Sequence, residues 1–202
     1  AFKIAVDMVN EKLISKNDAI LRIDPNSLDT LLHPTLNEKS SIEVIANGLP
    51  ASPGAASGKV VFTSEEAERL NSMMQDTILV RVETSPEDIQ GMHAAKGILT
   101  ARGGMTSHAA VVARGMGRPC VSGSSEIDIN YDKKIFKTSF CEVREGDTIT
   151  IDGSTGRIIL GNVPTVKPEI SGDFSRLMGW ADNIRKLKVR TNSETPLDTK
   201  TA

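Results

Sequence analysis

Chemistry in this chain centres on His108, which follows the stretch GGMTS at residues 103–107 and precedes AAVVARG, a run that begins with small apolar residues. This order places the imidazole at the expected start of a helix, beside unpaired backbone N–H groups and the positive end of the helix dipole. Such a helix start binds phosphate readily. It also favours the neutral imidazole, whose free ring nitrogen is a nucleophile. The sequence therefore predicts that His108 accepts a phosphoryl group covalently, and that the helix start stabilises the resulting dianion.

The residues around this histidine are expected to support its role. Gly103 and Gly104 would shape the loop and let its backbone approach a ligand. Thr106 and Ser107 would cap the helix and form hydrogen bonds near the imidazole. The helix body contains small residues that allow close packing on a sheet: Ala109, Ala110 and Ala113. Three cationic side chains are candidates for neutralising a phosphate: Arg102, Arg114 and Arg118.

Other chemistries fit these residues less well. A serine hydrolase is disfavoured because Ser107 and His108 are adjacent, neighbours on a helix do not face each other, and the chain has no G-x-S-x-G elbow. No metal site is expected, because the spacing of the histidines does not converge: His33, His93 and His108. The stretch GLPASPGAASGK at 48–59 lacks the Ser or Thr that follows the lysine of a P-loop, and is interpreted as a tight loop leading into a strand. The plainer alternative is that His108 only caps the helix.

The composition is that of an ordinary soluble domain, with 39% hydrophobic and 25% charged residues among 202. A formal net charge of −2 gives no basic field for nucleic acid or an anionic membrane. No apolar run approaches the roughly 20 residues that span a bilayer. Cys120 and Cys141 have no disulfide or metal-site spacing, so both are expected as reduced thiols of a cytoplasmic protein. The chain starts at Ala1 and ends on a strand-like run, so we expect a part of a longer protein.

Local patterns predict an α/β fold, with a compact domain over residues 42–163, a hairpin-rich side and helical flanking segments. Apolar spacing indicates helices at 1–15, 17–23, 27–33 and 174–187. Thr63 and Glu66 form a capping-box pattern that predicts a helix over 64–74. Ser85-Pro86 predicts another helix reaching Ala94, and a third should cover 107–116. Strands are expected at 59–62, 77–82, 97–101, 119–123, 148–152, 157–161 (the hairpin partner of 148–152) and 188–192.

Several stretches carry a family resemblance. ILTARGGMTSHAAVVARGMGRPCVSG (98–123) closely resembles the phosphohistidine segment of the pyruvate, phosphate dikinases, which belong to the phosphoenolpyruvate-utilising enzymes. The flanking stretches at 79–100 and 146–161 resemble the same family, as do ANGLPASPGAASGKVVF at 46–62 and VRTNSETPLDTKTA at 189–202. The resemblance covers essentially the whole chain. Nothing in it resembles the family's ATP-grasp region or its phosphoenolpyruvate barrel.

The resemblance implies an activity and a role for each segment. In this family the full enzyme interconverts ATP, pyruvate and phosphate with AMP, phosphoenolpyruvate and diphosphate, and a swivelling domain carries the phosphoryl group between two remote sites. His108 would be the carrier, phosphorylated on Nε2. Residues 1–41 would be a helical arm from the nucleotide-binding region, and 42–163 the swivelling β/β/α phosphohistidine domain. Residues 164–202 would hold a linker helix and the start of the phosphoenolpyruvate/pyruvate barrel.

The resemblance also implies cofactors and partners. Mg²⁺ would serve the parent enzyme outside this chain, with no metal held here. The ATP-grasp and barrel domains of the same chain would be the partners, in a homodimeric parent, with ATP, phosphate and pyruvate as substrates and neither nucleic acid nor membrane. In plant members the threonine two residues before the histidine is phosphorylated to switch the enzyme off. Thr106 occupies that position and is a candidate regulatory site.

Two other functions stay open. Phosphoenolpyruvate synthase and the sugar phosphotransferase enzyme I share the GG-x-T-x-H core, so the chain could be a carrier domain of either. A non-catalytic swivelling interaction domain would keep the fold without the chemistry. The chain by itself is not expected to turn over, because it carries neither substrate pocket of the family.

Overall fold

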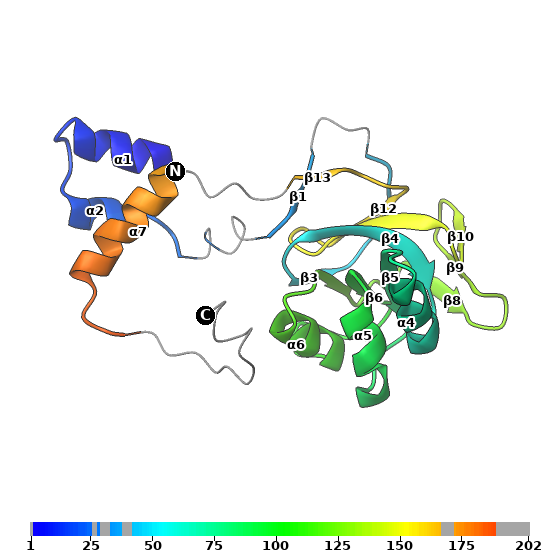
Figure 1. Ribbon diagram of the computed structural model, residues 1–202. Coiled ribbons are helices and arrows are strands. Elements are labelled where there is room, and N and C mark those ends of the chain that lie inside the picture. The colour runs from blue at the N-terminus through cyan, green and yellow to red at the C-terminus, as the bar shows by residue number, and fades with distance from the viewer. Residues whose placement is uncertain (1, 26–27, 29–32, 38–41, 167–171, 189–202) are drawn as a thin grey trace. The chain divides into compact units, whose positions relative to one another are not determined.

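The computed structural model describes residues 2–25, 28, 33–37, 42–166 and 172–188 (Figure 1). Contacts along the chain divide it into two compact units. The larger comprises residues 26–169, and the smaller combines residues 1–25 with 170–202. Each unit has its own hydrophobic core, and the predicted functional residues all lie in the larger one.

The centre of the larger unit is a mixed sheet of eight described strands in the order β2-β12-β11-β4-β5-β6-β7-β3. The neighbours β4, β5, β6 and β7 are parallel, and the remaining pairs are antiparallel. The strand bounds are Val44–Asn47 (β2), Leu49–Ser52 (β3), Ala55–Val61 (β4), Thr77–Arg81 (β5), Gly97–Thr100 (β6), Cys120–Ser122 (β7), Thr148–Asp152 (β11) and Arg157–Leu160 (β12).

The helices that connect the parallel strands pack on one face of this sheet (Figure 1). Their bounds are Ser64–Ser72 (α4), Pro86–Asp88 (the 3₁₀ helix η1), Ile89–Ala94 (α5) and His108–Gly115 (α6). Thr63 caps α4 as predicted, since its Oγ1 accepts a hydrogen bond from the Glu66 N–H at 3.2 Å. The alanines of α6 are fully buried against the sheet, which confirms the expected close packing: Ala109, Ala110 and Ala113.

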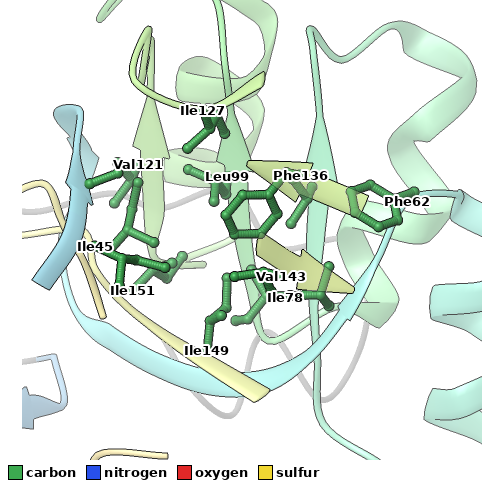
Figure 2. Close-up of a cluster of buried hydrophobic side chains, with 14 of the residues drawn as sticks. Ile45, Phe62, Ile78, Leu99, Val121, Ile127, Phe136, Val143, Ile149 and Ile151 are labelled. Carbon is green, nitrogen blue, oxygen red and sulfur yellow. The ribbon is translucent and has the colours of Figure 1, made fainter. Parts of the chain in front are cut away.

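A second, smaller sheet covers the opposite face. Its strands, in the order β10-β9-β8, span Asp128–Asn130 (β8), Ile135–Lys137 (β9) and Glu142–Arg144 (β10). Figure 2 shows the ring of Phe136 in the middle of the cluster between the two sheets. Phe136 is completely buried, and burial of such a side chain contributes about 1.5–3 kcal/mol. Two β layers and one helical layer make the predicted α/β fold of β/β/α type.

The smaller unit contains three described helices, α1 (Phe2–Asn10), α2 (Lys16–Leu21) and α7 (Gly172–Ile184). They share a core that includes Ala5, Ala19 and Leu177. The rings of Phe2 and Phe174 meet edge to face, with centroids 5.7 Å apart. The sequence indicated each of these helices, but it did not indicate that the two ends of the described chain pack together. None of the described helices is long and apolar enough to cross a membrane.

Two sequence-based expectations need correction. The stretch 48–59 is not a tight loop but most of two strands, β3 and β4, joined at Pro53-Gly54. Its small residues suggest a loop, yet they allow neighbouring strands to approach closely: a Cβ on Gly58 would lie 2.8 Å from the Thr77 backbone. The compact unit also extends beyond 42–163, because β1 (Thr35–Leu36) pairs antiparallel with β13 (Thr165–Val166). The predicted helix at 27–33 and strand at 188–192 lie almost entirely outside the described residues.

The two cysteines are free thiols, as the sequence predicted. Their environments differ. Burial raises the pKa of Cys120 to about 12, whereas Cys141 is only partly buried. At pH 8 we therefore expect iodoacetamide to alkylate Cys141 of the native chain first, and Cys120 only after unfolding. Mass spectrometry of timed samples measures both alkylation rates. Equal rates for the two cysteines in the native chain would contradict the burial of Cys120.

The same burial predicts a pH-dependent stability. The unfolded Cys120 thiol ionises above about pH 8.5, whereas the folded thiol stays protonated up to about pH 12. Ionisation in this window favours the unfolded chain, so the free energy of unfolding falls by up to about 1.4 kcal/mol per pH unit. Urea titrations from pH 8 to 10 measure this slope. The variant Cys120→Ala should have a shallower slope, and identical slopes would contradict the prediction.

Candidate functional site

The loop between β6 and α6 presents His108 as the first residue of its helix. Ser107 is the N-cap, and its Oγ accepts a hydrogen bond from the Ala110 N–H at 3.4 Å. Thr106 is exposed and does not cap. The imidazole of His108 is partly buried, at the positive end of the eight-residue helix.

Backbone hydrogen bonds tie this loop to the neighbouring strand. Ala101 N donates to Arg81 O at 3.0 Å, and Arg102 N donates to Val82 O at 2.9 Å, which extends the β5–β6 pairing beyond both strands. The start of α6 is therefore held at the carboxyl ends of the parallel strands, the edge at which α/β sheets bind ligands.

A contact that the sequence did not indicate orients the imidazole. His108 Nδ1 lies 2.9 Å from the Oγ1 of Thr84, which is partly buried in the segment between β5 and η1. The hydroxyl can donate or accept, depending on the tautomer. When Nδ1–H donates to Thr84, the lone pair of Nε2 is left available. Nothing in the local sequence ETSPED distinguishes Thr84 from an ordinary turn residue.

A chain of hydroxyl groups anchors the N-cap to the sheet. Thr100 Oγ1 donates to Ser122 Oγ at 3.1 Å, and the Oγ of Ser122 lies 3.3 Å from that of Ser107. Thr100 and Ser122 are completely buried on adjacent parallel strands. The helix start is thus fixed from beneath by β6 and β7.

The two glycines of the loop differ in their structural roles. Gly103 has a φ of +109°, and a Cβ there would lie 2.9 Å from the Ser107 Cβ, so a side chain would displace the cap. Its carbonyl also packs against Gly123, where a side chain would collide with it. Gly104 has no described atom within 4 Å of its ideal Cβ position. The expected shaping of the loop therefore rests on Gly103.

The three arginines also differ in position. Arg114 donates from Nε to Ala51 O at 3.0 Å and from Nη2 to Met105 O at 2.9 Å, so it ties the loop to β3. Arg118 lies beyond the other end of α6, a helix of eight residues that is about 12 Å long. Arg102 lies exposed on the loop itself. Arg114 thus has a clear structural role, and Arg102 and Arg114 are the two predicted cations that the fold places near the helix start.

A pocket of about 540 Å³ lies at the opposite, amino ends of the parallel strands. Arg118 and His33 line it, together with Lys59, Asp76 and Lys96. None of the loop residues 101–108 lines this pocket. Among the described residues, no group of three or more His, Cys, Asp and Glu could hold a metal ion.

The hydroxyl chain gives a stability prediction. Ser122→Ala leaves the buried hydroxyl of Thr100 without its acceptor, which should lower the free energy of unfolding by about 1–3 kcal/mol. Urea denaturation measures the change. Ser125→Ala, at an exposed turn of the same segment, is the matched control and should unfold like the wild type. Equal stability of the Ser122 and Ser125 variants would show that the hydroxyl chain contributes nothing.

Comparison with known proteins gives consistent results. Residues 73–156 match the family described as "PEP-utilising enzyme, mobile domain". The chain is 57% identical over 202 residues to pyruvate, phosphate dikinase of Rhizobium meliloti (strain 1021), covering 100% of the chain and 22% of that protein. It is 57% identical over 201 residues to the Clostridium symbiosum enzyme of the same name, covering 98% of the chain and 23% of that protein.

A plant relative is similar to the same degree. The chain is 56% identical over 200 residues to pyruvate, phosphate dikinase 2 of Zea mays, covering 98% of the chain and 23% of that protein. The chain thus spans 22–23% of the length of these three relatives.

Proposed function

We propose that this chain, whose residues 73–156 match the mobile domain of the phosphoenolpyruvate-utilising enzymes, carries the phosphoryl group of a pyruvate, phosphate dikinase on His108. The observation that carries this proposal is the hydrogen bond of 2.9 Å between His108 Nδ1 and Thr84 Oγ1 at the start of α6. It directs Nε2, the nitrogen that the family resemblance assigns to phosphorylation, away from the Thr84 contact.

The nucleophile in this mechanism is the lone pair of Nε2. With Nδ1–H donating to Thr84 Oγ1, Nε2 attacks the phosphorus atom of the donor, an N–P bond forms, and the P–O bond to the leaving group breaks. The imidazole ring gains positive charge in this step, and the oxygen of Thr84 stabilises the Nδ1–H that carries part of it. In the second transfer the acceptor oxygen attacks phosphorus, the N–P bond breaks, and Nε2 regains its lone pair.

The start of α6 stabilises the intermediate. The phosphoryl group on Nε2 is a dianion near the first turn, where backbone N–H groups and the helix dipole favour negative charge by about 0.3–1 kcal/mol at an exposed site. Arg102 is the exposed cation on the same loop and is proposed to neutralise part of the charge. Arg114 is proposed to act indirectly, by holding the Met105 carbonyl.

A carrier must also reach donors and acceptors that other parts of the enzyme bind. The exposed residues of the loop support this requirement: Arg102, Gly103, Met105 and Thr106. We propose the ATP-grasp and barrel domains of the same chain as partners, in a homodimer that uses ATP, phosphate and pyruvate, with magnesium at those other domains. Residues 1–41 and 164–202 would connect the carrier to them. A cytoplasmic location and the regulatory phosphorylation of Thr106 complete the proposal.

The decisive experiment uses the intact enzyme. Wild type should acquire acid-labile, alkali-stable label both from ATP labelled at the β-phosphate with inorganic phosphate and from labelled phosphoenolpyruvate, and His108→Asn should acquire none. His93→Asn, an exposed histidine of the same unit, is the matched control and should label normally.

Two results would contradict the proposal. Label on His108→Asn equal to that on wild type would make the histidine a cap only. Label from phosphoenolpyruvate alone would keep the carrier but favour an enzyme I type of function, with no ATP-dependent half-reaction.

A further inference from the structure

We propose that Tyr131 is a positioning residue for His108, acting through Val82 and Thr84. The Oη atom of Tyr131 accepts a hydrogen bond from the Val82 N–H at 2.8 Å, across 49 positions of sequence. Tyr131 lies in the turn between β8 and β9, in the small sheet, so this bond connects the second β layer to the site. This inference rests on the proposed function, which takes His108 as the Nδ1–H tautomer with Thr84 Oγ1 as its acceptor.

Val82 is fixed on both sides of its backbone. Its N–H donates to Tyr131, and its carbonyl accepts from the Arg102 N–H at 2.9 Å, in the loop that leads to His108. Thr84 follows two residues later. The phenol oxygen therefore accepts the last backbone hydrogen bond at the carboxyl end of β5, before the chain turns towards the imidazole.

A second anchor holds the far end of this short segment. The carboxylate of Asp88 accepts from the Ser85 N–H at 2.9 Å and from Ser64 Oγ at 3.0 Å, and its Oδ1 lies 3.4 Å from Arg81 Nε. Asp88 is buried, so this anchor is largely protected from water. Between the anchors at Val82 and Ser85 only Glu83 and Thr84 remain, and their backbone has little freedom.

Packing holds the ring of Tyr131 in place. The ring meets Phe62 edge to face, with centroids 6.3 Å apart and planes at 87°, and the guanidinium of Arg81 lies 5.4 Å from its centroid. Arg81 also donates from Nη1 to Phe62 O at 3.0 Å. The phenol is therefore preorganised, and Tyr131→Phe removes one hydroxyl while leaving the ring contacts unchanged.

Loss of that hydroxyl should act on the tautomer of His108. Without its acceptor, the Val82 N–H turns to water and the Thr84 segment gains freedom, which weakens the contact between Thr84 Oγ1 and His108 Nδ1. In the proposed mechanism Nδ1–H donates to Thr84 Oγ1. A weaker contact removes the acceptor of that tautomer, so the Nε2–H tautomer, which has no lone pair on Nε2 for attack, becomes more populated.

The test is long-range ¹H–¹⁵N NMR of the chain with ¹⁵N-labelled histidine, measured for the wild type and for Tyr131→Phe. We expect wild-type His108 to be mainly the Nδ1–H tautomer and the variant to show a larger Nε2–H fraction. The initial rate of phosphoryl labelling of the intact enzyme should fall about three- to tenfold, as expected for a slightly misplaced nucleophile. Thr138→Val is the control, because it removes backbone-capping hydrogen bonds of the same small sheet without touching Val82. It should leave the tautomer unchanged.

Each result decides the matter. An unchanged tautomer in Tyr131→Phe overturns the proposal, whether or not labelling slows, since a purely structural role would produce that pattern. An equal tautomer shift in Thr138→Val also overturns it, because general loosening of the sheet would then suffice. A tautomer shift specific to Tyr131→Phe supports it, even if neither protein can be phosphorylated, and in that case it is the proposed function that fails.

Discussion

The hydrogen bond between Thr84 and His108 joins the segments that follow two neighbouring parallel strands, and the chemistry proposed for the chain depends on it. Thr84 follows β5 and His108 follows β6, and these strands are parallel neighbours in register. Their carboxyl ends therefore lie at one edge, where the two connecting segments must pass each other. Because β5 and β6 are parallel neighbours, Thr84 can contact Nδ1 of His108 and leave Nε2 available.

Rigid support on both faces keeps that edge in place. On the helical face the alanines of α6 lie directly on the sheet, so the helix that carries the nucleophile has little room to shift. On the other face the small sheet contributes the buried Phe136, and its Tyr131 accepts a hydrogen bond from the Val82 N–H just after β5. A phosphoryl carrier that must meet separate donor and acceptor sites benefits from a nucleophile whose orientation is set by its own domain.

Local features of the site could be predicted from the sequence, and non-local ones could not. The start of α6, its cap and the small residues of its buried face follow from GGMTSHAAVVARG, because capping and helical periodicity act over a few residues. Thr84 and Tyr131 could not be identified, since their bonds reach across 24 and 49 positions and depend on strand order. The sequence predicts a loop over 48–59 because glycine and alanine are common in loops. In the structure these small residues let neighbouring strands approach closely, and the local sequence does not reveal that contact.

The central claim is that Thr84 occupies Nδ1 of His108 and leaves Nε2 to carry the phosphoryl group. Long-range ¹H–¹⁵N and ³¹P NMR of the phosphorylated enzyme, with ¹⁵N-labelled histidine, identifies the phosphorylated nitrogen directly. The account predicts phosphorus on Nε2, with Nδ1 protonated and still bonded to Thr84. Phosphorus on Nδ1, or on a different residue, would contradict it.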